Sequence, residues 1–232
     1  MNIRRSLNCL NLFDKCLWMV SVLVVTGSFL LSKNYNWLTL LASLVGVSAL
    51  IFLAKGNVMG QILTVVFSIL YGIVSYQYCY YGEMITYLGM TLPTAVAAIV
   101  SWMRNPFSDT EVKVSHMNIR KFLCLVAFTF FVTVFFYYVL KYLGTNNLYV
   151  STVSVITSFL ASGLMVLRSP YYAIAYSAND IVLIVLWILA SMDNISYLPM
   201  VFCFVMFFMN DLYGFYSWNN MKKRQSINGM QD

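Results

Sequence analysis

The sequence predicts an all-α protein that crosses a membrane several times, and three observations lead to this fold class. Hydrophobic residues make up 61% of the 232 positions and charged residues only 9%, whereas soluble domains carry roughly 25% charged residues. Apolar runs of about 17–23 residues recur along the chain, and each is long enough to cross the hydrocarbon core as a helix. The alternating apolar and polar pattern of a transmembrane β-barrel is absent.

Eight segments are predicted to be helices. The first, at 17–31, is short for a membrane span, and we interpret it as an extra N-terminal helix after a mildly basic start. The clearer segments are 37–53, 58–80, 84–103, 119–143, 148–167, 170–190 and 197–218. Pro93 lies in the middle of the 84–103 segment, where it removes one backbone hydrogen bond and predicts a kink.

The basic residues indicate how these segments are oriented. With the N-terminus inside, twelve of the fourteen lysines and arginines fall on the inner side, and Lys33 and Lys141 fall outside. Such an excess is the positive-inside signal of a helical membrane protein. We therefore expect a multi-pass protein of the cell membrane with both termini in the cytoplasm.

The segments divide into two similar halves. Residues 37–103 and 148–218 each hold three helices, and each half ends on Ser-Trp, at Trp102 and Trp218. Residues 104–147 supply a cytoplasmic loop and one linker helix. Because the linker crosses the membrane once, the second half has the same orientation as the first. Residues 1–36 precede this plan, and residues 219–232 form a cytoplasmic tail. Two parallel three-helix repeats are one known plan of transporters, in which the substrate binds between the repeats near the membrane midplane.

Several classes of function are excluded by what the sequence lacks. The five cysteines are odd in number and never spaced Cys-x-x-Cys, and His116 is the single histidine, so neither a disulfide framework nor a metal site is expected. No Gly-x-Ser-x-Gly or phosphate-binding loop pattern is present. The basic residues are not gathered on one soluble module, so nucleic acid is not an expected partner. We expect no cofactor and no enzymatic activity.

Polar side chains inside the apolar segments mark a candidate substrate site. Several recur at helical spacing and therefore share one helix face, and no lysine or arginine lies at the depth of the two acids. An intramembrane polar face usually meets a cavity or a neighbouring helix, so an interhelical hydrogen-bond clamp is the alternative to a site. Glu83 is interpreted as a solvated loop charge. The candidate substrate-binding residues are Gln61, Tyr71, Tyr87, Tyr172, Tyr176, Asn179, Asp180, Asn210, Asp211 and Tyr213.

From about residue 37 to residue 218 the chain resembles the PnuC family of vitamin transporters. The resemblance is carried by the three-plus-one-plus-three plan, by Arg168 at the start of the 170–190 helix, by the aromatic-rich spans, and by the ending Leu-Tyr-Gly-Phe-Tyr-Ser-Trp218. In that family a Trp-x-x-Trp-x-x-x-Asn motif lines the substrate site. The matching positions here are Tyr172, Ala175 and Asn179, so the resemblance implies that the asparagine is retained and both tryptophans are replaced. A family glutamine corresponds to Tyr87.

The resemblance also implies a function and partners. A homotrimer in the lipid bilayer would mediate facilitated uptake of nicotinamide riboside between the repeats, and phosphorylation by a cytoplasmic kinase would trap the substrate inside. Because a stacked tryptophan holds a cationic ring by up to about 2 kcal/mol, its loss at Ala175 favours a (deoxy)nucleoside as an equal substrate. The alternative is a proton- or sodium-coupled carrier of another small vitamin such as thiamine, with Asp180 and Asp211 as ion ligands.

The topology can be tested with single cysteines at Asn34 and Asn228 in a chain whose five native cysteines are replaced by alanine. We expect an impermeant thiol reagent outside intact cells to label Asn34→Cys and not Asn228→Cys, because eight spans place these positions on opposite sides. Labelling of both sites in opened cells is the control. Equal labelling in intact cells would contradict the eight-span map.

Overall fold

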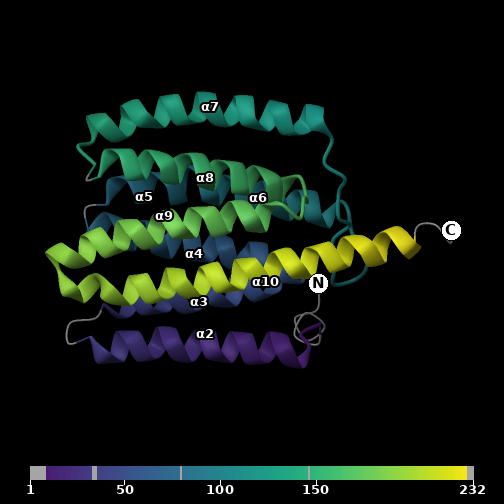
Figure 1. Cartoon of the computed structure of the whole chain (residues 1–232), viewed down its shortest axis with the longest axis horizontal. Coiled ribbons are helices and arrows are strands. Elements are labelled where there is room, and N and C mark those ends of the chain that lie inside the picture. The colour runs from purple at the N-terminus through teal and green to yellow at the C-terminus, as the bar shows by residue number, and fades with distance from the viewer. Residues whose placement is uncertain (1–8, 33–35, 79, 146, 229–232) are drawn as a thin grey trace.

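The computed structural model describes residues 9–32, 36–78, 80–145 and 147–228, which form a bundle of helices lying side by side (Figure 1). The helices are α2 (Leu12–Leu31), α3 (Trp37–Ala54), α4 (Val58–Gln77), α5 (Tyr81–Thr86), α6 (Leu92–Met103), α7 (Ile119–Tyr142), α8 (Leu148–Val166), α9 (Tyr172–Asp193) and α10 (Leu198–Asn228). A π-helical turn, η1 (Tyr87–Thr91), joins α5 to α6, and a 3-10 turn, η2 (Ile195–Tyr197), precedes α10. The described ranges hold eight helical stretches long and apolar enough to cross a membrane, so the predicted fold class is confirmed.

Two helices extend beyond their predicted ends for local reasons. At the start of α2, the Asn11 side chain accepts the backbone N–H of Asp14, and the Asp14 carboxylate accepts that of Asn11. This reciprocal cap satisfies donors that a first helical turn leaves unpaired, so α2 begins at Leu12 rather than at residue 17. Helix α10 continues to Asn228 rather than ending at residue 218, because no glycine or proline interrupts residues 219–228.

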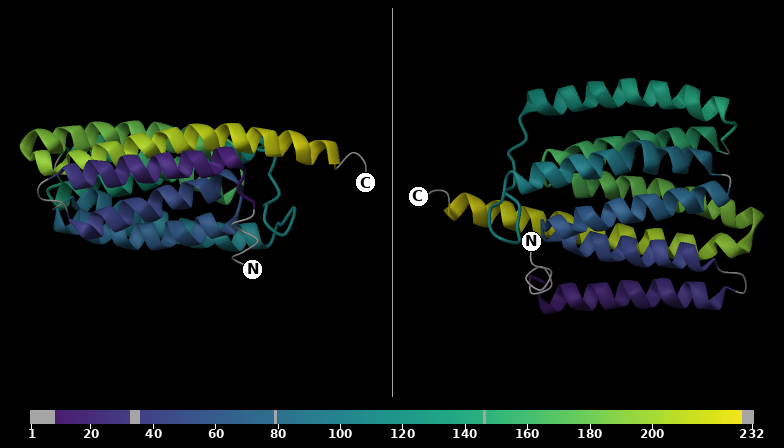
Figure 2. Two further views of the ribbon diagram at one scale, coloured as in Figure 1. Left: turned by 90° about the horizontal axis from the view of Figure 1, so that it is seen from below. Right: turned by 180° about the vertical axis from the view of Figure 1, so that it is seen from behind.

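The helices form two triplets between two outer helices. The first triplet is α3, α4 and α5–α6, the second is α8, α9 and α10, and α2 and α7 lie at opposite edges of the bundle (Figures 1 and 2). The third helix of each triplet packs against the first helix of the other, α10 on α3 and α6 on α8. Helix α7 packs against α8 and buries Thr129 and Leu140, so most of its surface is left to lipid or to another chain.

The irregularity predicted at Pro93 takes the form of the π-helical turn. The Leu92 N–H donates to the Tyr87 carbonyl, and Pro93 follows at the start of α6. Proline has no N–H to donate, and the wider turn accommodates that gap between α5 and α6. Tyr87 and Thr91, at the two ends of the turn, are both buried, so the turn presents polar side chains to the middle of the bundle.

Two tryptophans tie the halves together at the end of the bundle that the charge pattern places in the cytoplasm. The indole N–H of Trp102 (α6) donates to the carbonyl of Met165, 3.1 Å away at the end of α8. The indole N–H of Trp218 (α10) donates to the carbonyl of Leu53, 2.8 Å away at the end of α3. The two buried rings contact each other with centroids 5.5 Å apart. We call Trp102 and Trp218 the tryptophan pair. Each of its hydrogen bonds joins the third helix of one triplet to the first helix of the other.

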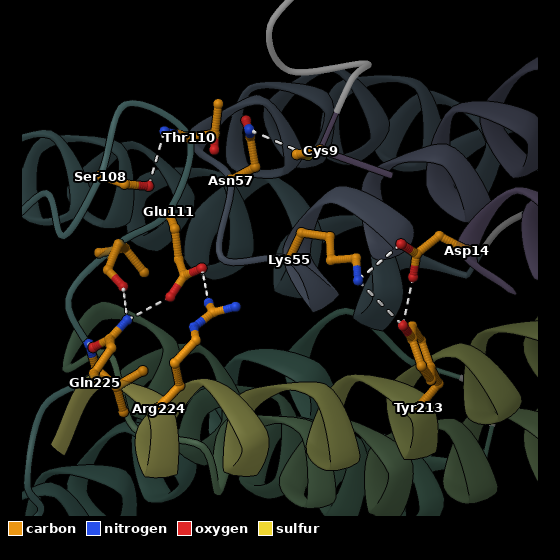
Figure 3. Close-up of polar contacts among 12 residues, drawn as sticks. Cys9, Asp14, Lys55, Asn57, Ser108, Thr110, Glu111, Tyr213, Arg224 and Gln225 are labelled. Carbon is orange, nitrogen blue, oxygen red and sulfur yellow. Dashed lines mark hydrogen bonds and ion pairs between the residues drawn. The ribbon is translucent and has the colours of Figure 1, made fainter. Parts of the chain in front are cut away.

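Ionic clusters at the same end hold α2 and the loop before α7 in place (Figure 3). Asp14 of α2 is fully buried and accepts hydrogen bonds from the Tyr213 hydroxyl and from Lys55, whose Nζ is 2.8 Å away. Glu111 of the loop pairs with Arg224 of α10. These contacts join segments that are far apart in the sequence, so they fix α2 and the loop against α3 and α10.

Candidate functional site

A small cavity lies between the two triplets. Its volume is about 50 Å³, and its lining comes from α3, α4, η1, α6, α8, α9 and α10, with no described residue of α2 or α7. This space suits one or two water molecules of about 30 Å³ each, whereas ligand pockets measure roughly 300–1,000 Å³, so a drug-sized ligand does not fit in this arrangement of the helices. The polar and aromatic lining residues are Gln61, Thr64, Phe67, Tyr87, Thr91, Thr94, Ser162, Tyr176, Asn179, Asp180, Phe207 and Asp211.

Asn179 is the centre of a hydrogen-bond network on one wall of the cavity. Its Oδ1 accepts hydrogen bonds from three hydroxyl groups of α8, those of Thr157 (2.8 Å), Ser158 (3.0 Å) and Ser154 (3.4 Å). Spacings of three and four residues place these hydroxyls on one face of the helix. Because the amide oxygen is occupied, the NH₂ group of Asn179 is the part left to donate to a ligand in the cavity.

Asp180 of α9 and Asp211 of α10 meet at the cavity wall. Both are buried, and their carboxyl groups are close enough to hydrogen-bond to each other. An ionised carboxylate can only accept hydrogen bonds, so the two carboxyl groups can bond to each other only when one of them is protonated. Within the described residues, no lysine or arginine forms an ion pair with either acid.

Two polar atoms at this wall lack a partner. Nε2 of Gln61 and Oδ2 of Asp180 are buried and have no hydrogen-bond partner among the described residues. A buried polar group left unpaired costs about 1–3 kcal/mol. Because both side chains line the cavity, a polar ligand in this space would supply the missing hydrogen bonds.

The structure brings six of the ten predicted site residues to the cavity: Gln61, Tyr87, Tyr176, Asn179, Asp180 and Asp211. Tyr71 lies behind the wall, with its ring centroid 4.4 Å from that of Tyr87, and its hydroxyl accepts the indole N–H of Trp187 at 3.0 Å. Tyr172 packs edge-to-face against Trp218, with centroids 4.9 Å apart. Ala175 belongs to the same packed cluster and does not line the cavity.

Asn210 and Tyr213 lie on the side of α10 that faces α2. Nδ2 of Asn210 donates to Oγ of Ser21, 2.9 Å away, and Tyr213 bonds to Asp14. Both residues therefore attach α2 to α10 and lie outside the cavity lining. Helical periodicity places them on a polar stripe of α10, but it cannot show that α2 covers this stripe.

The interpretation of Glu83 as a solvated loop charge is wrong. Glu83 lies in the first turn of α5 with 1% of its surface exposed, and its Oε1 is 3.3 Å from Oγ of Ser154. A side chain at Gly82 would meet Thr145, 3.0 Å away, so glycine allows the chain to approach the connection between α7 and α8 at this point. The missed signal is the aromatic pair Tyr80–Tyr81, which extends the apolar segment past Glu83.

The chemistry of the cavity suits reversible binding of a flat polar molecule. Carboxyl and amide groups match hydroxyl and N–H groups, and the rings of Phe67, Tyr87, Tyr176 and Phe207 offer faces and edges to a planar ring. Among the described residues, no group of three or more His, Cys, Asp or Glu side chains is placed to hold a metal ion.

Comparison with known proteins points to one group of membrane transporters. The nicotinamide mononucleotide transporter family model matches residues 36–220. The nicotinamide riboside transporter PnuC of Neisseria mucosa is 27% identical over 218 residues, which cover 91% of this chain and 83% of that protein. The nicotinamide riboside transporter PnuC of Haemophilus influenzae is 23% identical over 192 residues, 82% of each chain. A crystal structure of the vitamin B3 transporter PnuC matches with a TM-score of 0.80 and 26% identity, covering 93% of this chain and 94% of that one.

Proposed function

The chain belongs to the nicotinamide mononucleotide transporter family, the family of PnuC, and we propose that it mediates facilitated uptake of nicotinamide riboside or a (deoxy)nucleoside. It is a multi-pass membrane transporter rather than an enzyme. In this proposal the substrate binds in the cavity between the two triplets, which act as repeats that move around it to open the site to each side in turn.

One observation carries the proposed site. The unpaired atoms of Gln61 and Asp180 lie at the wall of a cavity that both triplets surround. Buried polar groups in proteins are normally hydrogen-bonded, and a ligand restores that condition. A ribose hydroxyl both donates and accepts, so the sugar of a nucleoside can pair with the carboxyl group and with the side-chain amide.

The substrate class follows from the rings and charges at the cavity. Nicotinamide riboside carries a positive pyridinium ring, which aromatic faces and the Asp180–Asp211 pair would attract. The NH₂ group of Asn179 would donate to the carbonyl of a carboxamide or of a base. Tyr87 and Tyr176 are weaker partners for a cation than tryptophan, which supports a nucleoside as an equal substrate.

An ion-coupled carrier of another small vitamin such as thiamine is the second candidate, and the contact between Asp180 and Asp211 supports it. A shared proton at an intramembrane acid pair is a group that a transport cycle can load and release. In facilitated diffusion, by contrast, the same pair would keep its proton throughout the cycle and would only attract the substrate and hydrogen-bond to it.

The tryptophan pair is suited to close the cytoplasmic side of the site. Separating the triplets at that end would break both indole hydrogen bonds together, because each joins the last helix of one triplet to the first helix of the other. We propose that these bonds hold the cytoplasmic side shut and break when the substrate leaves.

The transporter would lie in the cell membrane with both termini in the cytoplasm, and a cytoplasmic kinase would trap the substrate by phosphorylating it. The exposed aromatic surface of α7, which includes Phe128, Phe131 and Phe135, supports a homotrimer in which α7 contacts a neighbouring subunit or lipid.

The role of Asn179 predicts the behaviour of one variant. We expect Asn179→Leu to reduce nicotinamide riboside uptake by at least tenfold while the protein still folds, because an unpaired ligand group costs about 1–3 kcal/mol. Uptake by cells with equal amounts of membrane-inserted protein measures this. Asn219→Leu, whose side chain bonds within its own helix to Phe215, is the control. Normal uptake by the Asn179 variant would exclude this residue from the site.

Counterflow in liposomes tests the substrate and the energy source together. We expect purified protein to exchange labelled for unlabelled nicotinamide riboside without any ion gradient, and a (deoxy)nucleoside to compete at similar concentrations. Protein-free liposomes are the control. Exchange that requires a proton or sodium gradient would favour the ion-coupled carrier, and a lack of competition by every nucleoside would restrict the substrate to the pyridinium compound.

Loss of a hydrogen bond of the tryptophan pair is predicted to increase access to the cavity from the cytoplasm. We expect Trp218→Phe to speed labelling of Ser162→Cys in inside-out vesicles by roughly three- to tenfold, because the variant loses one hydrogen bond worth about 0.5–1.5 kcal/mol. Trp187→Phe, which loses an indole bond to Tyr71 instead, is the matched control. Equal labelling rates in the two variants would argue against a gate at the tryptophan pair.

A further inference from the structure

A single hydroxyl group connects Glu83 to Asn179. Oγ of Ser154 lies 3.3 Å from Oε1 of Glu83 and 3.4 Å from Oδ1 of Asn179. The three side chains come from α5, α8 and α9, and none is more than 2% exposed. Glu83 is not among the residues that line the cavity, so any effect it has on a ligand there must pass through another residue.

The hydroxyl of Ser154 has one proton and two acceptors beside it. A carboxylate is a stronger acceptor than an amide oxygen, so an ionised Glu83 draws this proton to itself. A protonated Glu83 would instead donate to Ser154, whose own proton is then free for Asn179. Ser154 therefore donates to Asn179 when Glu83 is protonated and to Glu83 when Glu83 is ionised.

The burial of Glu83 costs folding free energy. Its Oε2 is buried without a hydrogen-bond partner among the described residues, and within those ranges no lysine or arginine forms an ion pair with it. A buried acid of this kind is a poor choice for packing alone, because an apolar residue of similar size commonly gives equal or greater stability.

We propose that Glu83 is a positioning residue for substrate binding. In its protonated form Glu83 donates to Ser154, and the Ser154 proton then holds the oxygen of the Asn179 amide toward α8, with the NH₂ group toward the cavity. The inference rests on the proposed role of Asn179 in the site, and it adds a residue that itself touches no substrate.

A double-mutant cycle tests this connection with nicotinamide riboside as the probe. We expect Glu83→Leu and Ser154→Ala each to weaken binding to purified protein by about tenfold, or 1.4 kcal/mol. The double variant should bind no more weakly than the weaker single variant, because both changes interrupt one path. Glu83→Gln, which can still bond to Ser154, should restore most of the affinity. Independent effects that multiply to about a hundredfold would overturn the proposal, as would unchanged binding by Glu83→Leu.

A second measurement needs no substrate and therefore separates this inference from the proposed function. In protein labelled with ¹⁵N-asparagine, the side-chain NH₂ resonance of Asn179 is identified by its loss in Asn179→Leu. We expect Glu83→Leu and Ser154→Ala to shift this resonance, and Thr145→Val, a nearby buried change outside the path, to leave it in place. An unmoved resonance in Glu83→Leu would overturn the proposal whatever the substrate is. A shifted resonance without nicotinamide riboside binding would overturn the substrate assignment alone.

Discussion

Hydrocarbon offers no hydrogen bonds, so each polar group in this bundle must find its partner inside the protein. Most serine and threonine hydroxyls meet this condition locally, by donating to a carbonyl one turn earlier in their own helix, as Ser43, Ser68 and Ser177 do. Amide and carboxyl side chains cannot be satisfied so simply and require partners on other helices. Asn179 therefore bonds to α8 and Asp180 lies against Asp211 of α10, both within the second triplet. The unpaired atoms of Gln61 and Asp180 lie at the cavity between the triplets.

The same requirement gives α2 its place in the bundle. Its Ser21 accepts a hydrogen bond from Asn210, and its Asp14 is paired with Tyr213 and Lys55. These contacts convert polar residues of α10 into an attachment surface for a helix outside the two triplets. The polar face of α10 is thus divided between two tasks. Asp211 faces the cavity from one side of the helix, while Asn210 and Tyr213 hold α2 on the other.

This division explains how much of the site the sequence could predict. Hydropathy located the spans because about twenty apolar residues have few alternatives to a membrane helix, and spacing identified the polar faces of α4 and α9. Spacing cannot say which neighbour covers a face, so it groups Tyr71 and Asn210 with Asn179 although they pair with Trp187 and Ser21. Glu83 was misplaced for a related reason, because its burial depends on contact with α8 rather than on its own segment.

A cavity of about 50 Å³ cannot hold a nucleoside, so in the proposed function the triplets would have to separate to admit one. At the cytoplasmic end they are joined by the directional hydrogen bonds of the tryptophan pair. At the opposite end Tyr78 of the first triplet contacts Trp187 and Tyr197 through ring packing, with centroids 6.2 and 4.9 Å apart. Hydrogen bonds weaken steeply as their geometry is lost, whereas aromatic pairs tolerate a range of separations and tilts. Both ends combine the two kinds of contact, because Trp187 of α9 also donates its indole N–H to Tyr71 of α4 and the rings of the tryptophan pair pack on each other.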